Sequence, residues 1–134
     1  MVRWLFTVYG SATISTANSS GDFALTIPDA YGGPYNYIRI PKGFKAKIWA
    51  KRLSGTANFR LIVRFIPDVV NAPSTTVDVD SEYLASPGTL ELEKRRPIVI
   101  VAKTGNEAIK FSYDNTGTGT IAFAADIELT DEEE

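Results

Sequence analysis

Acidic side chains recur at alternate positions in two segments of this chain. Asp78, Asp80 and Glu82 would offer oxygen ligands for Ca²⁺ if they lay in a loop, but they lack the glycine and the long spacing of an EF-hand loop. Glu91 and Glu93 would lie side by side on a strand, whereas the two carboxylates of a glycosidase flank a cleft at a defined separation. We therefore interpret the first group as a solvated strand edge and the second as partners of nearby basic side chains.

Two residue types that carry much of enzyme chemistry are missing, because the chain has no cysteine and no histidine. Their absence excludes disulfides, thiolate zinc sites, cysteine nucleophiles and every mechanism that needs a histidine base, the Ser-His-Asp triad included. The glycines of the segment DNTGTG precede no helical pattern, so a phosphate-binding loop is not indicated. We expect a protein that is not an enzyme and that uses no cofactor and no metal.

The segment FKAKIWAKR, residues 44–52, divides its side chains between an apolar face and a basic face. Phenylalanine, alanine and isoleucine occupy one parity and are suited to a core. The other parity holds three lysines and a tryptophan, namely Lys45, Lys47, Trp49 and Lys51. If the strand at 58–66 returns as a hairpin partner, Arg60 and Arg64 share this basic and aromatic face.

Several functions are open for that face. It could be a solvated wall, since lysines discourage sheets from joining edge to edge. Flat aromatic side chains could instead contact a glycan, and the candidate sugar contacts are Tyr31, Tyr35, Tyr37 and Trp49. Residues 1–67 carry nine basic and two acidic side chains, and residues 68–134 carry five basic and fourteen acidic ones, so copies could also attract one another. We do not expect nucleic acid as a partner, because the net charge is −2 and no recognised motif is present.

Hydrophobic residues alternate with polar ones along most of the chain, at the two-residue period of β-strands. Ile109–Tyr113 and Ile121–Leu129 are examples, and turn residues such as Thr104-Gly105-Asn106 separate the strands. No segment has a helical period, so the sequence predicts an all-β protein, an antiparallel β-sandwich of jelly-roll-like form with eight to ten strands. Residues 1–130 are predicted to form one domain, followed by an acidic C-terminal tail at 131–134.

Two of the predicted strands are apolar on both parities. A sandwich has one core, so the second face of such a strand needs another cover. The predicted self-association residues are Trp4, Leu5, Phe6 and Tyr9 in the first strand, and Ile98, Val99, Ile100 and Val101 in the second. We expect a homo-oligomer, and the alternative is that a long loop of the same chain covers these strands.

The composition also bears on the setting of the protein. No apolar run approaches the roughly 20 residues that span a bilayer, and the beginning MVRWLFTVYG is not typical of a signal peptide, so we expect no membrane partner. The location is left open between an interior compartment and a particle surface. The chain has no glutamine and one methionine, and this scarcity of chemically fragile side chains favours a thermostable protein.

Two segments resemble parts of a known class of proteins. YNYIRIPKGFKAKIWAKRLSGTANFRLIVRF looks like the strand–proline–turn–strand arrangement of small β-sandwich proteins from phage and other virus particles. FSYDNTGTGTIAFAADIEL is similar to the turn and long strand that close such domains. The resemblance covers under half of the chain and implies a jelly-roll structural subunit of a capsid, a decoration protein or a fibre, with other virion proteins as partners. A carbohydrate-binding sandwich module is the alternative.

Overall fold

The computed structural model describes residues 3–27, 35–52, 59–84, 98–115 and 117–131. Its strands are β1 (Arg3–Ile14), β2 (Ser20–Asp22), β3 (Ala24–Thr26), β4 (Ile38–Arg39), β5 (Lys45–Arg52), β6 (Phe59–Ile66), β7 (Val77–Leu84), β8 (Ile98–Val101), β9 (Ala108–Asn115) and β10 (Gly119–Thr130). Within these ranges no helix is long and apolar enough to cross a membrane.

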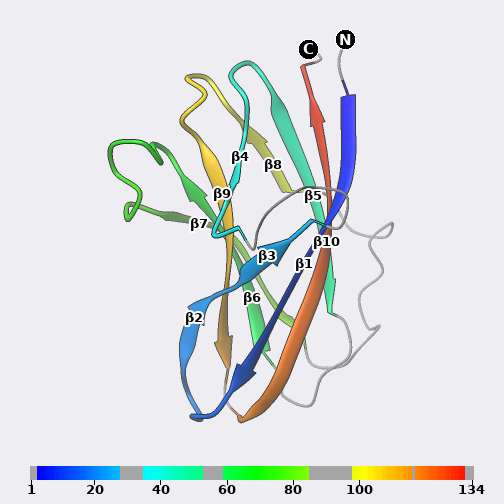
Figure 1. The fold of residues 1–134 in the computed structure, drawn as a ribbon, viewed down its shortest axis with the longest axis vertical. Coiled ribbons are helices and arrows are strands. Elements are labelled where there is room, and N and C mark those ends of the chain that lie inside the picture. Colours follow the sequence, from blue (N-terminus) through cyan, green and yellow to red (C-terminus); the bar gives the residue numbers. More distant parts are fainter. Residues whose placement is uncertain (1–2, 28–34, 53–58, 85–97, 116, 132–134) are drawn as a thin grey trace.

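The strands form two antiparallel sheets that pack face to face (Figure 1). Sheet A has the strand order β3-β1-β10-β5-β8. Sheet B has the order β2-β9-β6-β7, and β4 also pairs with β9. The predicted all-β antiparallel sandwich is therefore confirmed.

One short segment belongs to both sheets and joins the two layers along one side. Asp22 ends β2, which pairs with β9, and Ala24 begins β3, which pairs with β1. Between them, the Phe23 N–H donates to the Phe111 carbonyl at 2.9 Å. A strand that changes sheets in this way makes a corner of the sandwich, and the Phe23 side chain is buried there.

The core consists of apolar side chains at alternate positions, which face the opposite sheet. The core face of β10 contains Ile121, Phe123, Ala125, Ile127 and Leu129. The Phe123 ring packs against Phe23 and Phe111, with centroid distances of 4.7 and 4.9 Å. The long final strand predicted from the alternation is confirmed, and its central phenylalanine connects the two sheets.

Gly10 leaves the space that the Phe123 ring occupies. The two residues are opposite each other in the β1–β10 register, and a Cβ at position 10 would clash with Cε1 of Phe123. We therefore expect Gly10→Ala to lower the free energy of unfolding by about 1–3 kcal/mol, the usual cost of overpacking a core, as measured by urea denaturation. Gly117→Ala is the control, because a Cβ there would meet no atom within 4 Å. Equal effects of the two substitutions would contradict this account.

A buried carboxylate holds the turn between β8 and β9. Glu107 is 6 % exposed. Its Oε2 accepts hydrogen bonds from the Lys103 N–H at 2.6 Å and the Thr104 N–H at 3.1 Å, and its Oε1 accepts from the Gly105 N–H and the Thr104 hydroxyl, both at 2.9 Å. Burial by itself raises the pKa of Glu107, but the donors from Lys103 and Thr104 outweigh burial and lower that pKa to about 2. Gly105, at a φ of 87°, supplies the left-handed conformation of this predicted turn.

Candidate functional site

The outer face of sheet A combines two surfaces that the sequence predicted separately. In one row of the register, Leu5 of β1 lies opposite Glu128 of β10. Glu128 in turn lies opposite Lys47 of β5, and Lys47 lies opposite Val99 of β8. This row crosses four strands and contains members of both the predicted self-association set and the predicted basic and aromatic face.

Apolar side chains are exposed at both margins of sheet A. The exposed members of the predicted self-association set are Trp4 (49 %), Leu5 (65 %), Tyr9 (41 %), Val99 (48 %) and Val101 (51 %). Phe6 and Ile98 are partly buried and pack against the core. For Ile100 the prediction is wrong, because its side chain lies on the core parity of β8 and is buried.

Trp4 has a different environment from the other exposed members. It lies on the core parity of β1, opposite Leu129 of β10, near the beginning of the strand. Its ring stacks on Phe44 at a centroid distance of 5.3 Å and an interplanar angle of 14°. One face of the Trp4 ring therefore packs against Phe44, while about half of the residue's surface is still exposed.

Acidic side chains of β10 lie between basic side chains of the neighbouring strands. The Arg3 guanidinium contacts the Glu128 carboxylate at 2.7 Å, and Lys47 lies opposite Glu128 on the other side. The Thr7 hydroxyl donates to Asp126 at 2.7 Å. The basic N-terminal half and the acidic C-terminal half of the chain thus meet within one sheet, and this face carries charges of both signs.

Arg60 and Arg64 do not belong to this face, and the predicted β5–β6 hairpin is wrong. β5 lies in sheet A and β6 in sheet B. Arg60 forms an ion pair with Asp114 of β9 at 3.0 Å, on the outer face of sheet B. Alternating apolar residues are expected both for strands paired in one sheet and for strands that face each other across a core, so the pattern did not distinguish the two. The side chain of Lys51 lies outside the described residues.

In the described part of the chain, the outer edge of β1 is unpaired over half of the strand's length. β3 pairs only with Tyr9–Ser11, and in the described part of the chain no strand pairs with Arg3–Val8 on that side. Figure 1 shows this half of β1 at the margin of sheet A, beyond the point where β3 ends. An exposed edge strand can pair with a strand of another chain, and natural proteins usually have features that prevent such pairing.

The hydrogen bonds of β3 show which residues of β1 direct their backbone N–H and C=O groups toward this edge. Leu25 exchanges both of its backbone hydrogen bonds with Tyr35, at 2.8 and 2.7 Å, so its N–H and C=O point away from β1. In an antiparallel ladder the direction alternates from residue to residue, so the odd-numbered positions of β1 turn their backbone groups toward β3. Leu5 and Thr7 therefore direct theirs to the open edge.

A groove of about 400 Å³ lies on the outer side of sheet B. It is lined by Asp22, Asn36, Tyr37, Ile66, Pro73 and Lys110. These residues come from β2, from the segment just before β4, from the end of β6 and the segment after it, and from β9. Val69 anchors that segment after β6 by packing against Ile66 and Ala108.

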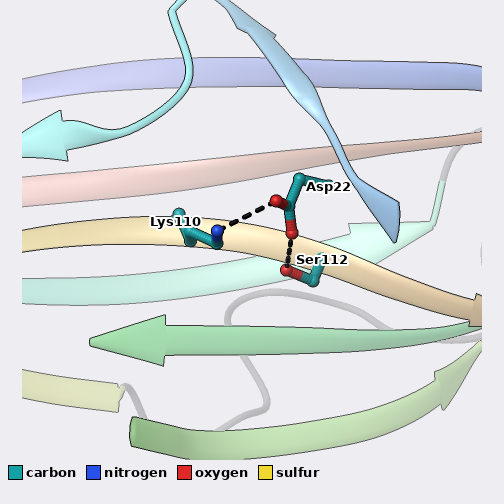
Figure 2. A network of polar contacts seen from close by, with 3 residues as sticks. All are labelled: Asp22, Lys110 and Ser112. Atoms are coloured by element: carbon teal, nitrogen blue, oxygen red, sulfur yellow. Dashed lines mark hydrogen bonds and ion pairs between the residues drawn. The ribbon is translucent and has the colours of Figure 1, made fainter. Parts of the chain in front are cut away.

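Two of the lining residues, Asp22 and Lys110, belong to a polar network that Figure 2 shows. The Asp22 carboxylate accepts from the Ser112 hydroxyl at 2.6 Å and from the Lys110 ammonium at 2.9 Å, and the three side chains converge between β2 and β9. Burial raises the pKa of Asp22, but the bonds from Ser112 and Lys110 outweigh it, and Arg64 adds a smaller electrostatic effect, so the pKa is lowered. Asp22 is therefore ionised at neutral pH.

Three of the four candidate sugar contacts lie in the described part of the chain, and these three are not brought together. Tyr37 lines the groove on sheet B, whereas Trp49 lies on β5 in sheet A. Tyr35 is partly buried against the core, and Tyr31 lies outside the described residues. The sequence did not indicate Asp22, Asn36 or Lys110, because Asp22 and Lys110 are 88 positions apart and share no local pattern.

Among the described residues no group of three metal-binding side chains occurs, and the side chains of Asp78, Asp80 and Glu82 lie outside the described part. Comparison with known proteins found no matching family model, no similar curated protein and no similar solved structure.

Proposed function

We propose that this protein is a non-enzymatic structural subunit that self-associates by adding the sheet A of one copy to the sheet A of another. The observation that carries the proposal is the open edge of β1, where Leu5 and Thr7 direct backbone groups outward beside exposed apolar side chains. An unpaired edge of this kind is a template for strand addition, in which main-chain hydrogen bonds supply affinity and side chains set the register.

An antiparallel pairing about a two-fold axis fits the residues of this edge. With the axis at Leu5, each Leu5 lies opposite the Leu5 of the second copy, and Arg3 lies opposite Thr7 of the second copy. All of these positions direct their backbone groups outward, so the pairing forms hydrogen bonds in both directions. Identical strands then contribute identical surfaces, as a two-fold interface requires.

The side chains complement one another in the same register. On the core parity, Trp4 lies opposite Phe6 of the second copy, so the two partly exposed rings gain a cross-strand partner. On the outer face, Arg3 of the second copy lies opposite Thr7 of the first copy. On its other side, Thr7 lies opposite Asp126 of its own copy and donates to that carboxylate. The guanidinium, which contacts Glu128 of its own copy, brings positive charge toward that carboxylate, so the register is charge-complementary on each side.

A continuous sheet across two copies is suited to a wall or shell. Val99 and Val101, on β8, lie at the opposite margin of sheet A and supply a second apolar surface through which such dimers can contact further copies. We propose a virion as the setting, with a capsid, decoration or fibre subunit as the role. This proposal rests on the resemblance in the sequence and on the exposed apolar margins.

The test is a substitution that removes one outward N–H without removing bonds to β10. Proline has no N–H and is tolerated on edge strands where that group faces outward. We expect wild type to have the mass of two chains in multi-angle light scattering at micromolar concentration. Leu5→Pro loses two hydrogen bonds per dimer, so its dissociation constant should rise about 30-fold or more.

Leu5→Thr is the matched control, because it removes the same apolar side chain and keeps the N–H. It should weaken the dimer less than Leu5→Pro does. Circular dichroism should give the same β-sheet spectrum for all three proteins. A wild type that is monomeric at micromolar concentration, or a Leu5→Pro variant as dimeric as wild type, would disprove pairing through β1.

A further inference from the structure

The groove on sheet B has the size and the lining of a ligand site. Its volume of about 400 Å³ lies within the range of roughly 300–1,000 Å³ that is common for small-molecule sites. The Asp22, Asn36 and Lys110 side chains supply polar atoms, while Tyr37, Pro73 and Ile66 supply apolar surface. A few placed polar groups beside an aromatic ring are typical of sites for ligands that have one apolar face and one polar edge.

The carboxylate of Asp22 is held in place and still has hydrogen-bonding capacity. Oδ1 accepts from Ser112 and Oδ2 accepts from Lys110, so each oxygen has used one of its two acceptor positions. The Lys110 ammonium has three N–H donors and gives one to Asp22. A ligand hydroxyl can therefore donate to Asp22 and accept from Lys110 without breaking the network.

The apolar side of the groove offers a flat surface to a ligand. Tyr37 is 39 % exposed, although a tyrosine ring usually finds a packing partner, and it lines the groove together with Pro73. Ile66, which is buried, also lines the groove. The C–H groups on one face of a pyranose ring pack well on such a surface, because the negative face of an aromatic ring attracts them.

The charges of the groove favour a neutral ligand. Asp22 is ionised and paired with Lys110, and Arg64 lies close enough to lower the pKa of Asp22 further. An anionic ligand would meet the Asp22 carboxylate, and a cationic ligand would meet the Lys110 ammonium. A neutral molecule with adjacent hydroxyls avoids both penalties and uses both members of the ion pair as hydrogen-bonding partners.

We propose that this groove binds a neutral pyranose sugar, with Tyr37 contacting the ring face and Asp22, Lys110 and Asn36 contacting hydroxyls. The site lies on sheet B, whereas the proposed β1 interface lies on the edge of sheet A, so a dimer would present two copies of it. Both tryptophans lie on sheet A, at positions 4 and 49, so a change in tryptophan fluorescence is not expected on binding. Binding and self-association are independent, and either can fail alone.

The experiment is saturation-transfer NMR of the full chain with neutral pyranoses, namely glucose, galactose, mannose and N-acetylglucosamine and their β-linked disaccharides. Glucuronic acid and glucosamine are included as the anionic and cationic counterparts. We expect saturation transfer to at least one neutral sugar, with weaker transfer to its charged counterparts. Transfer to none of the neutral sugars, or to the charged ones alone, would overturn the proposal.

Two variants locate the site, and one serves as the control. Tyr37→Ala and Asp22→Asn should each weaken binding about tenfold, since each removes a contact worth roughly 1.4 kcal/mol. Tyr9→Ala is matched to Tyr37→Ala, because Tyr9 is 41 % exposed and lies on the opposite sheet, and it should leave binding unchanged. Binding that survives both groove substitutions, or that is lost with Tyr9→Ala, would place the sugar elsewhere and overturn the assignment.

Discussion

Replacing Phe123 with alanine will lower the free energy of unfolding by about 4 kcal/mol, within the usual range for truncating a buried phenylalanine. The ring has no exposed surface, and it contacts Phe23 at the corner between the sheets and Phe111 on sheet B. Truncation therefore leaves a cavity between the two layers. Phe111 is held by β9, and Phe23 is held between β2 and β3 by its hydrogen bond to Phe111, so the cavity cannot collapse fully.

Urea denaturation followed by circular dichroism measures this loss, and Tyr9→Ala is the control. Tyr9 is a neighbouring aromatic residue on sheet A but is exposed, so its truncation should cost less than about 1 kcal/mol. The double variant Gly10→Ala with Phe123→Ala should be more stable than the sum of the single effects predicts, because the added methyl group enters the vacated space. Strict additivity, or a loss below about 1 kcal/mol for Phe123→Ala, would show that the ring does not organise the core.

Glu107→Ala will lower the free energy of unfolding by about 3 kcal/mol at neutral pH, because it leaves the N–H groups of the β8–β9 turn without their acceptor. The expected size agrees with the shift in pKa. A pKa lowered from 4.5 to about 2 corresponds to about 3 kcal/mol of stabilisation by the ionised form. The Asp114→Asn variant is the control, since the Arg60–Asp114 pair is exposed and should contribute less than about 1 kcal/mol.

The same carboxylate predicts a pH dependence with a defined sign. The pKa of Glu107 is lower in the folded chain than in the unfolded chain, so the unfolded chain binds the proton first as the pH falls. The contribution is complete above pH 4.5 and is lost progressively as the pH falls toward about 2. Urea denaturation should give a large difference in the free energy of unfolding between wild type and Glu107→Ala at neutral pH. Near pH 2 the same difference should be small. A difference that does not change with pH would contradict the role given to the ionised form.

The sequence predicted the strands well because their signal is local. In β10, apolar residues from Ile121 to Leu129 occupy every second position, and each one is buried. The Thr104–Asn106 turn was predicted from residue types that favour turns, and Gly105 does adopt the conformation that glycine permits. These features depend on residues that are close together in the chain.

The candidate sites were predicted only in part. Leu5, Tyr9 and Val99 were identified because apolar residues occur on both parities of their strands, and they are exposed. The assignment of Arg60 and Arg64 to the basic and aromatic face was wrong because it assumed that β6 is the hairpin partner of β5. The actual partners are β10 and β8, and the acidic residues of β10 lie beside the lysines.

The sequence by itself determined that the chain builds two-faced antiparallel strands, because the two-residue period of side chains is a property of each strand alone. Only the tertiary structure decided which strands share a sheet, which edge of β1 is left open and which side chains meet in the groove of sheet B. Those features arise from contacts between distant segments, such as Asp22 with Lys110, and many pairings satisfy the same local pattern of burial. The selection among them comes from the simultaneous packing of all the strands around Phe123 and its neighbours.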